Sequence, residues 1–476
     1  MERAPRPGGL EVAAFFGLLG ALLLGNAVVP TWLRAHHFGF SNYDLGIYSQ
    51  ALARLAIDPP NPWLSGRQIH LFNDHVDPIL FLVAPFTWRW PAVEVALVAE
   101  ALFALLALVP LAWLAREGRL SRTAWWLLGA LLVLDVGVTQ GLTFPAHPTT
   151  WAMAPLALLL AALLLERWRV ALLALVLLLA CKEEFPFVGL ALVPYAWKRA
   201  PRWVAWSFGS LSAVWGILAL AVRPWLLGPV ESEHAATPFR GLEQGLGAFL
   251  ALRFAPHQLA AMGNLLAAFL PLAVCLAWKR WRGERAPDGA GWLFLALAPL
   301  LGIRFLSMAW QAHYAAVVVA GGVLGLAALL GTRPVPRWVA AATVVLLIAG
   351  NEPFLRRTAR VLGGQHGWGG SADCPDAPGR VDAVARAIER VRAAPGPLLV
   401  SGNLLPWLAE RGDVVAYGGE PEGFDPSTVL LEAPTCGDTW GQPTPAREAA
   451  WRAAHERTAR AVLADDAFVY AATFAR

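Results

Sequence analysis

The stretch LEVAAFFGLLGALLLGNAVVP, residues 10–30, decides the class of fold, because it is an apolar run long enough to cross a bilayer. A perpendicular helix needs about 20 such residues to span the hydrocarbon core. Arg3 and Arg6 precede the run, as in a secretory signal peptide. The run is longer than a usual signal-peptide core, however, and no convincing small-residue cleavage site follows it. We therefore expect an uncleaved first transmembrane helix.

The composition of the whole chain agrees with this first run. The 476 residues are 57% hydrophobic and 15% charged, with a mean hydropathy of +0.50 and 23 Trp. Soluble domains are usually about 45–50% apolar and about 25% charged, and Trp is enriched at membrane interfaces. The net charge of +4 arises from basic residues in short loops, so it gives no reason to expect a nucleic-acid partner.

Further apolar runs predict a polytopic helical bundle of about eleven spans, in direct contact with the lipid bilayer. The spans are expected near 10–30, 92–115, 123–138, 150–165, 169–181, 185–197, 203–222, 258–278, 291–303, 313–331 and 338–350. Lys and Arg concentrate in alternate short loops, such as REGRLSR (116–122) and KRWRGER (279–285). Because such loops stay on the cytoplasmic side, we expect the N-terminus inside and the long first loop, 31–91, outside.

The C-terminal segment, 351–476, differs from residues 1–350 in being more charged and lacking a spanning run. RVDAVARAIERVRAA (380–394) has helical periodicity, whereas PLLVSGN, DVVAYGG and STVLLEA are typical of short strands. We predict a small α/β domain on the outer side. It contains Cys374 and Cys436, which could pair in an exported domain.

An acidic residue, Asp44, opens the stretch DLGIYSQALARLA, in which Leu45, Tyr48, Leu52 and Leu55 recur at helical spacing. This pattern predicts an amphipathic helix lying at the outer membrane interface. A carboxylate in the first turn of a helix is stabilised by the unpaired N–H groups and by the dipole. From the residues alone, Asp44 is either a helix cap or a catalytic group.

Other ionisable residues fall at the same predicted outer ends of the spans, which suggests one polar cavity on that face. HLFNDHVDP (70–78) is rich in His and Asp; it could bind a divalent metal or sugar hydroxyls, or be a polar loop with local turns. The full set of predicted substrate-binding residues is His75, Asp77, His147, Lys182, Glu183, Glu184, Arg304 and His313. The metal candidates are Asp44, Asp74, His75 and Asp77, and the metal requirement is left open.

Six pieces of the chain, taken in order, resemble a bacterial family of polytopic membrane proteins of unknown function that is related to the GT-C glycosyltransferases. The pieces are YDLGIYSQ, HVDPIL, AHPTTWAMAPLALLL, CKEEFPFVGLAL, QAHYAAVVVA and LLVSGNLLPWLAERGDVVAY. Two positions depart from the family's pattern, which usually has an acid after His-Pro and Glu-Asp after the lysine. Here Thr149 stands at the first position, and Glu183 and Glu184 at the second.

The resemblance implies a GT-C-like membrane bundle whose large first outer loop carries interfacial helices, and a sugar donor linked to polyprenyl phosphate. It also implies an acid in that loop as base or metal ligand, and Asp44 stands at the matching place. We expect Asp44 to accept the proton of the acceptor hydroxyl. Lys182, and secondly Arg304, would stabilise the leaving phosphate.

The expected function is therefore transfer of a sugar from a polyprenyl-phosphate donor to an envelope acceptor at the outer face of the bacterial cytoplasmic membrane. Two alternatives stay open. Ionisable groups lining an outer cavity also suit a proton-coupled transporter, although the sequence has no visible inverted repeat. The second alternative is a non-catalytic scaffold or sensor with the same fold, because a fold does not prove an activity.

Overall fold

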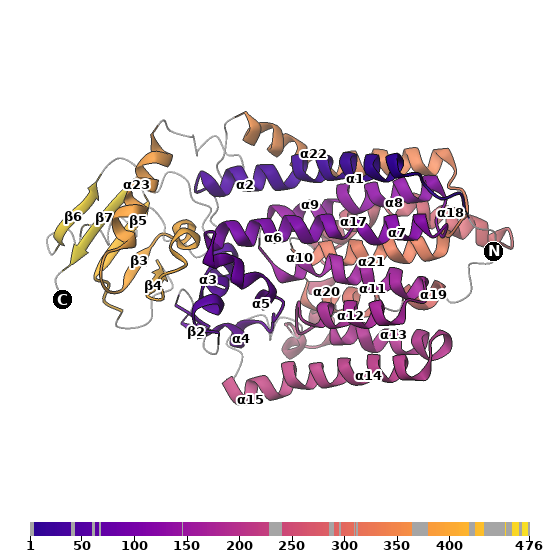
Figure 1. The fold of residues 1–476 in the computed structure, drawn as a ribbon, viewed down its shortest axis with the longest axis horizontal. Coiled ribbons are helices and arrows are strands. Elements are labelled where there is room, and N and C mark those ends of the chain that lie inside the picture. Colours follow the sequence, from indigo (N-terminus) through magenta and orange to yellow (C-terminus); the bar gives the residue numbers. More distant parts are fainter. Residues whose placement is uncertain are drawn as a thin grey trace.

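The structure of the protein is a computed structural model. It describes residues 4–39, 43–59, 62–65, 68–144, 146–227, 240–284, 290–294, 297–308, 310, 313–363, 379–417, 424–432, 453, 459–465 and 469–474. Most of these residues form a long bundle of roughly parallel and antiparallel helices, and a smaller α/β unit caps one end of it (Figure 1). Cys374 and Cys436 lie outside the described residues, so their pairing stays a prediction.

The bundle is built from helices that follow the predicted apolar runs. Its main helices are α1 (Gly9–Leu23), α2 (Val29–His36), α6 (Ala92–Leu106), α7 (Val109–Arg116), α8 (Arg122–Leu134), α9 (Val136–Thr143), α10 (Pro148–Trp151), α11 (Met153–Leu164), α12 (Trp168–Leu179), α13 (Pro186–Arg199), α14 (Arg202–Ile217), α15 (Arg223–Leu227), α16 (Leu246–Arg253), α17 (Pro256–Ala267), α18 (Leu270–Trp281), α19 (Ala290–Leu293), α20 (Leu297–Ser307), α21 (His313–Leu330) and α22 (Arg337–Leu362). The most buried of the long helices is α21, in which nearly every side chain is shielded.

Within the described residues, five helical stretches are long and apolar enough to cross a membrane, some of them with a local break. They are Gly9–His36, Ala92–Arg116, Arg122–Thr143, Arg202–Leu227 and His313–Leu330. The pair α17 and α18 would add a sixth, although it is bent by 69° at the break between them. Shorter apolar helices, such as Trp168–Leu179, accompany these stretches. The predicted number of about eleven spans stays a prediction.

Two helices depart from the predicted spans for local reasons. The run predicted at 123–138 is interrupted at Asp135, whose Oδ1 accepts a hydrogen bond from the N–H of Gly137 at 2.8 Å and so caps α9. The last bundle helix, α22, does not end near 350 but continues to Leu362. The boundary predicted between 350 and 351 therefore lies inside a helix, and the division into two domains stays a prediction.

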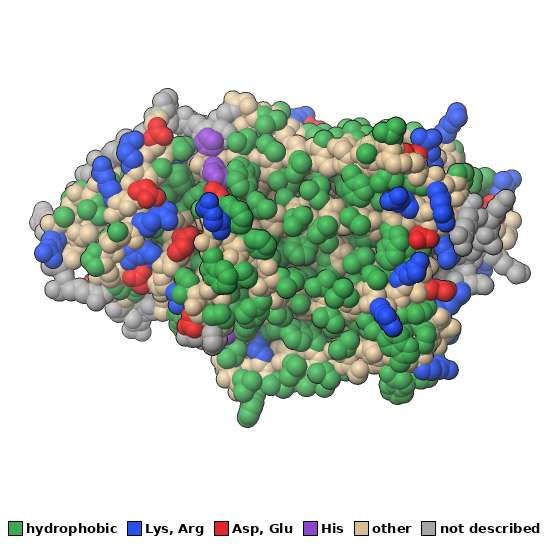
Figure 2. Space-filling model, viewed as in Figure 1, with side chains coloured by type: hydrophobic (Ala, Val, Ile, Leu, Met, Phe, Trp, Pro, Cys, Tyr) green, Lys and Arg blue, Asp and Glu red, His purple; other side chains and the backbone are tan. Residues whose placement is uncertain are grey.

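The surface of the bundle carries a broad apolar belt. Figure 2 shows hydrophobic side chains over its middle, whereas Lys and Arg gather at the end that carries the N-terminus. The opposite end lies against the α/β unit (Figure 1). This distribution is typical of a membrane bundle, because lipid-facing side chains must be apolar along the hydrocarbon core.

The first loop forms the connection between the bundle and the α/β unit. Its elements are α3 (Tyr43–Ile57), β1 (Trp63–Leu64), β2 (Ile69–His70), α4 (Leu71–Asp74), α5 (Leu80–Val83) and the 3-10 helix η2 (Ala84–Trp88). The face predicted for α3 is buried, as expected, but the intervening residues Ile47 and Ala51 are buried too. The predicted helix at the membrane interface is thus enclosed, since both the bundle and the C-terminal unit pack against it.

The C-terminal unit contains the predicted helix and three predicted strands, together with two strands that were not predicted. Its elements are α23 (Arg380–Arg392), β3 (Leu398–Val400), the 3-10 helix η9 (Gly402–Leu408), β4 (Val414–Ala416), β5 (Thr428–Glu432), β6 (Ala459–Asp465) and β7 (Val469–Phe474). The strand order is β4-β3-β5-β7-β6, with β3 parallel to β4 and β5, and β7 antiparallel to β5 and β6. The predicted class, a helical membrane bundle with a small α/β unit, is confirmed.

Candidate active site

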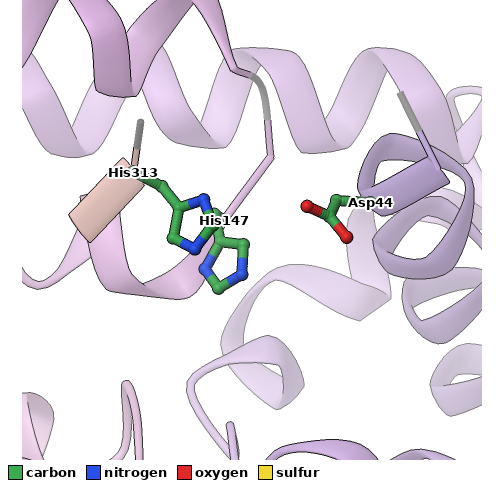
Figure 3. A group of neighbouring side chains, drawn as sticks. All are labelled: Asp44, His147 and His313. Carbon is green, nitrogen blue, oxygen red and sulfur yellow. The ribbon is translucent and has the colours of Figure 1, made fainter. Parts of the chain in front are cut away.

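Three side chains from distant parts of the chain meet where the bundle adjoins the C-terminal unit. Asp44 lies in the first turn of α3, His147 precedes α10, and His313 begins α21 (Figure 3). One carboxylate oxygen and one ring nitrogen from each histidine all lie within 4.8 Å of one another. Asp44 is half-buried and both histidines are buried, so the acid faces a pair of shielded imidazoles.

The backbone of α10 orients the ring of His147. Its Nδ1 accepts a hydrogen bond from the N–H of Thr149 at 3.4 Å, which leaves the ring proton on Nε2. That nitrogen lies 3.4 Å from the hydroxyl of Tyr48, which in turn donates to Asp77 Oδ2 at 3.0 Å. His147, Tyr48 and Asp77 thus form one hydrogen-bonded chain, although the family's usual acid is replaced by Thr149.

Asp77 lies at the buried end of that chain, in the loop between α4 and α5. Burial raises the pKa of Asp77 to about 7, against the opposing effects of His75, Lys182 and the hydrogen bond from Tyr48. A carboxyl group with this pKa takes up and releases a proton near neutral pH. Asp77 can therefore change its protonation state near neutral pH while its Oδ2 accepts the hydrogen bond from Tyr48.

A second contact ties the same loop to the turn between α12 and α13. Glu183 Oε1 lies 3.1 Å from His75 Nδ1, and its other oxygen accepts a hydrogen bond from the N–H of Val76 at 3.1 Å. Burial and Lys182 lower the pKa of His75, but the carboxylate of Glu183 outweighs both, and the net direction is upward. Glu183 therefore holds the loop in place through a charged pair.

Two buried cations flank the aromatic ring of Tyr314. Lys182 Nζ lies 5.1 Å from the ring centroid and Arg304 Cζ lies 4.4 Å from it. Arg304 is also paired with Glu184, whereas Nζ of Lys182 has no hydrogen-bond partner among the described residues. The charge of Lys182 is compensated by the nearby carboxylates of Glu183 and Asp77, but its N–H groups make no hydrogen bond to the described residues and can donate to an anionic group.

An apolar cavity of about 500 Å³ lies between α17, α18, α20 and α21, and Leu301 and Val318 are part of its lining. Arg304 follows Leu301 by one helical turn, and Tyr314 precedes Val318 by one turn. Arg304 and Tyr314 are therefore one helical turn from residues that line the cavity.

The three clustered side chains could also supply metal ligands, but their present geometry does not suit one ion. The rings of His147 and His313 are stacked, with centroids 3.5 Å apart and planes only 5° from parallel. An imidazole binds a metal along the nitrogen lone pair, which lies in the ring plane, so two parallel stacked rings cannot both point at one ion. One ring must turn before Asp44, His147 and His313 can bind a divalent cation together.

The predicted site residues divide into three groups around this point. Asp44, His147 and His313 meet directly, Lys182, Glu184 and Arg304 surround Tyr314, and His75, Asp77 and Glu183 tie the loops together. The predicted metal candidates Asp74, His75 and Asp77 are not in the described cluster that contains Asp44.

Tyr48 and Tyr314 were missed as site residues. Tyr48 was assigned only to an apolar helix face, and Tyr314 had no signal beyond its place beside His313.

The apolar bundle, the capping α/β unit and the polar cluster between them define the chain as a helical membrane protein. The chain belongs to the family described as "Predicted membrane protein (DUF2079)", whose profile matches residues 34–428. A comparison with curated proteins finds no match.

A solved structure of a glycosyltransferase resembles the chain in fold. ArnT from Cupriavidus metallidurans bound to undecaprenyl phosphate matches with a TM-score of 0.54 and 14% identity, over 97% of each chain. The arabinofuranosyltransferase AftD from Mycobacteria has a TM-score of 0.46 and 14% identity, over 91% of this chain and 37% of its own. At this level of identity, the likeness to ArnT concerns the fold alone.

Proposed function

We propose that the protein is a membrane glycosyltransferase that moves a sugar from a polyprenyl-phosphate donor to an acceptor hydroxyl at the outer face of the cytoplasmic membrane. The observation that carries the proposal is that one site contains both an acid, Asp44, and two buried cations, Lys182 and Arg304. Asp44 faces His147 and His313, while Lys182 and Arg304 flank Tyr314, and Arg304 is one helical turn from the lining of an apolar cavity. The structure of ArnT with undecaprenyl phosphate shows that a protein of this fold binds such a lipid.

The residues divide between the two ends of the reaction. The acceptor oxygen attacks the anomeric carbon as Asp44 accepts the proton of the hydroxyl. The bond between that carbon and the phosphate oxygen breaks, and the electron pair leaves with the polyprenyl phosphate. Lys182 and Arg304 stabilise the negative charge that develops there, and the apolar cavity holds the isoprenoid chain nearest the phosphate.

The histidines and the loop contacts would shape the sugar pocket. Both ring nitrogens of His147 are engaged by Thr149 and Tyr48, so His147 would shape the pocket through its position and through its stacking on His313. Tyr48 and Asp77 fix the ring of His147. A bound divalent cation, if one ring turns, would polarise a phosphate oxygen at the same place.

The test compares wild type with Asp44→Asn, which keeps the size of the side chain and removes its charge. Asp58→Asn is the matched control, because Asp58 follows the opposite end of the same helix. Each protein is reconstituted in lipid with radiolabelled polyprenyl-phosphate sugars and a membrane extract as the acceptor source. The release of sugar from its carrier is measured, and folding is checked by thermal melting.

We expect turnover in wild type and in the control, with a loss of about 10²–10⁴-fold in Asp44→Asn. Equal turnover in all three proteins would reduce Asp44 to a helix-capping residue and overturn the mechanism. A folded wild type that binds no polyprenyl phosphate and consumes no donor would overturn the proposed function, and the scaffold alternative would replace it.

A further inference from the structure

We propose that the C-terminal unit positions Asp44, by holding the segment that carries it on both sides. The role of Asp44 in the reaction rests on the proposed function, but the positioning itself can be tested without any turnover. Two groups of contacts support the proposal: one precedes Asp44 in the chain and the other follows it. Both connect the first loop to residues more than 300 positions away.

The contact before Asp44 is a buried polar cluster. Arg380 Nη1 donates to the carbonyl of His37 at 2.9 Å, and Asn403 Nδ2 donates to the carbonyl of Phe38 at 3.1 Å. Both side chains also bind the carboxylate of Glu432. Because the cluster is buried, its bonds are not weakened by competition with water.

Phe38 strengthens this first attachment. Its ring belongs to the apolar core of the C-terminal unit, among Val384, Ile388 and Leu404. Its backbone adopts φ 52°, a value that a residue other than glycine rarely takes unless its surroundings impose it. The end of α2 is therefore held in one conformation by the C-terminal unit.

The contact after Asp44 is a close approach of two helices. A Cβ atom on Gly46 would lie 2.7 Å from Cδ2 of Leu405 and 3.3 Å from its Cβ. Leu405 is fully buried in η9, so α3 lies against the C-terminal unit with room for glycine only. Gly46 is two residues from Asp44, so any displacement of α3 at this point moves the carboxylate as well.

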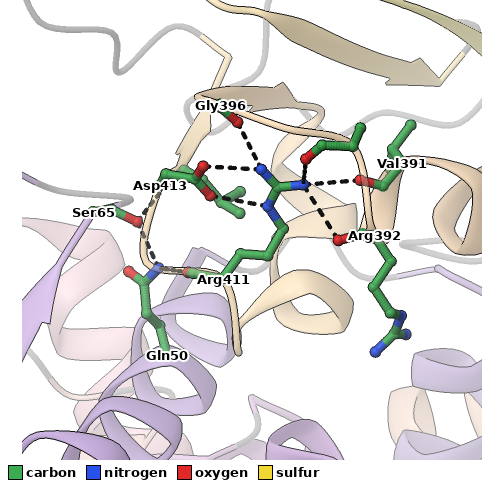
Figure 4. A network of polar contacts seen from close by, with 9 residues as sticks. Gln50, Ser65, Val391, Arg392, Gly396, Arg411 and Asp413 are labelled. Carbon is green, nitrogen blue, oxygen red and sulfur yellow. Dashed lines mark hydrogen bonds and ion pairs between the residues drawn. The ribbon is translucent and has the colours of Figure 1, made fainter.

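A polar network extends this contact by one turn (Figure 4). Gln50 Nε2 donates to Ser65 Oγ at 2.7 Å, and Ser65 donates to the carbonyl of Val414 at 2.6 Å. The network is anchored by Arg411, whose guanidinium binds both oxygens of Asp413 and the carbonyl of Gly396. The register of α3 along its own axis is thus fixed relative to the C-terminal sheet.

These contacts make Leu405 and Gln50 positioning residues for Asp44. Catalytic geometry is sensitive to displacement, since a shift of about 1 Å can reduce a rate by about 10²-fold. The competing explanation is that the C-terminal unit only stabilises the chain as a whole. If the C-terminal unit positions Asp44, a change at this contact moves residue 44 to an extent that the loss of stability does not explain. If the unit only stabilises the chain, the position of residue 44 changes only as stability is lost.

The experiment adds side-chain volume on one side of the contact between α3 and η9 and removes it on the other side. Gly46→Ala adds a methyl group that crowds Leu405, and Leu405→Ala removes Cδ2 and Cγ, the two atoms nearest to that methyl group, while Cβ stays at 3.3 Å. Gly17→Ala is the matched control, because a Cβ there meets nothing within 4 Å. Each change is placed in a full-length background with Asp44→Cys and His147→Cys, and the introduced thiols are linked with a short bifunctional thiol reagent.

We expect Gly46→Ala to slow the linking reaction by about 10-fold, with a smaller loss of melting temperature than Leu405→Ala causes, because overpacking usually costs less than a buried cavity. Adding Leu405→Ala should restore the linking rate, and Gly17→Ala should leave it unchanged. The proposal is overturned if Gly46→Ala has no effect, if Leu405→Ala does not restore the rate, or if the rate follows the melting temperature across the set.

Donor turnover, measured with the same substitutions in the natural background, separates this proposal from the proposed function. If both hold, turnover falls and recovers in the same order as the linking rate. If the linking rates follow the expected order and no donor is consumed by any protein, the positioning role stands and the glycosyltransferase proposal fails.

Discussion

Glu184 compensates the charge of Arg304, and its removal should make the protein depend on an anionic ligand. The guanidinium is almost completely buried and the carboxylate is 11% exposed. Removing one partner of a buried ion pair leaves the other charge uncompensated, which costs about 3–5 kcal/mol. We therefore expect Glu184→Gln to lower the free energy of unfolding by about that amount.

A phosphate bound at the same corner would replace the missing carboxylate. Ligand at 100 times its dissociation constant stabilises the native state by about 2.7 kcal/mol. The phosphate should also bind the variant more tightly, because Glu184 no longer competes for Arg304. A short-chain isoprenyl phosphate should thus raise the melting temperature of Glu184→Gln more than that of wild type at the same concentration.

The assay is thermal melting in lipid nanodiscs over a series of isoprenyl phosphate concentrations. Glu389→Gln is the matched control, because Glu389 belongs to an exposed pair with Arg392, and such pairs contribute about 0–1 kcal/mol. The reasoning is refuted if Glu184→Gln melts like wild type, or if the ligand raises the melting temperatures of both proteins equally.

Three further predictions concern the neighbouring contacts. Tyr48→Phe leaves the buried Asp77 without its hydroxyl donor, and calorimetry should record a loss of about 1–3 kcal/mol. Because the pKa of Asp77 is raised to about 7 in the folded protein, the folded state binds an extra proton between about pH 4 and pH 7. The contribution of Asp77 to stability should therefore be greatest below that window and fall by up to about 4 kcal/mol as the pH rises through it. Melting measured over a range of pH should show a flatter profile for Asp77→Asn than for wild type. An unchanged profile in Asp77→Asn would contradict this expectation. Gly189→Ala should weaken the packing of α13 on α14 by about 1–3 kcal/mol, since the new methyl group meets Ser212; Gly17→Ala, measured in the same way, should not destabilise the protein.

Apolar runs were sufficient to predict the bundle, because burial in lipid leaves a strong signal in each helix. The strands β3, β4 and β5 were predicted for a similar reason, as each is a short run of Val, Leu and Thr bounded by Gly, Pro or charged residues. The enclosure of α3 was not predicted. Its outer face carries Ile47 and Ala51, which fit a lipid interface and a protein contact equally well.

The sequence singled out candidate site residues but not how they are arranged. Ionisable groups at the predicted ends of apolar runs stand out because their placement there is costly. Which of them meet depends on how the helices pack, so the sequence could not show that Asp44 lies beside His147 and His313 and apart from Asp74, His75 and Asp77, whose role stays a prediction. The sequence did not identify Tyr48 as a site residue, because it lies at helical spacing with Leu45, Leu52 and Leu55. An aromatic residue on such an apolar helix face is equally consistent with packing.

The insertion of Phe38 into the core of the C-terminal unit bears on how the protein matures. Chains are synthesised from the N-terminus, so Phe38 enters the membrane environment long before α23 and the strands that surround its ring exist. The final part of translation then completes two structures at once, a folded C-terminal unit and a fixed first loop. In a ribosome-stalled or truncated chain that lacks this unit, the helices would still insert, but the contacts that hold the end of α2 and the start of α3 would be missing.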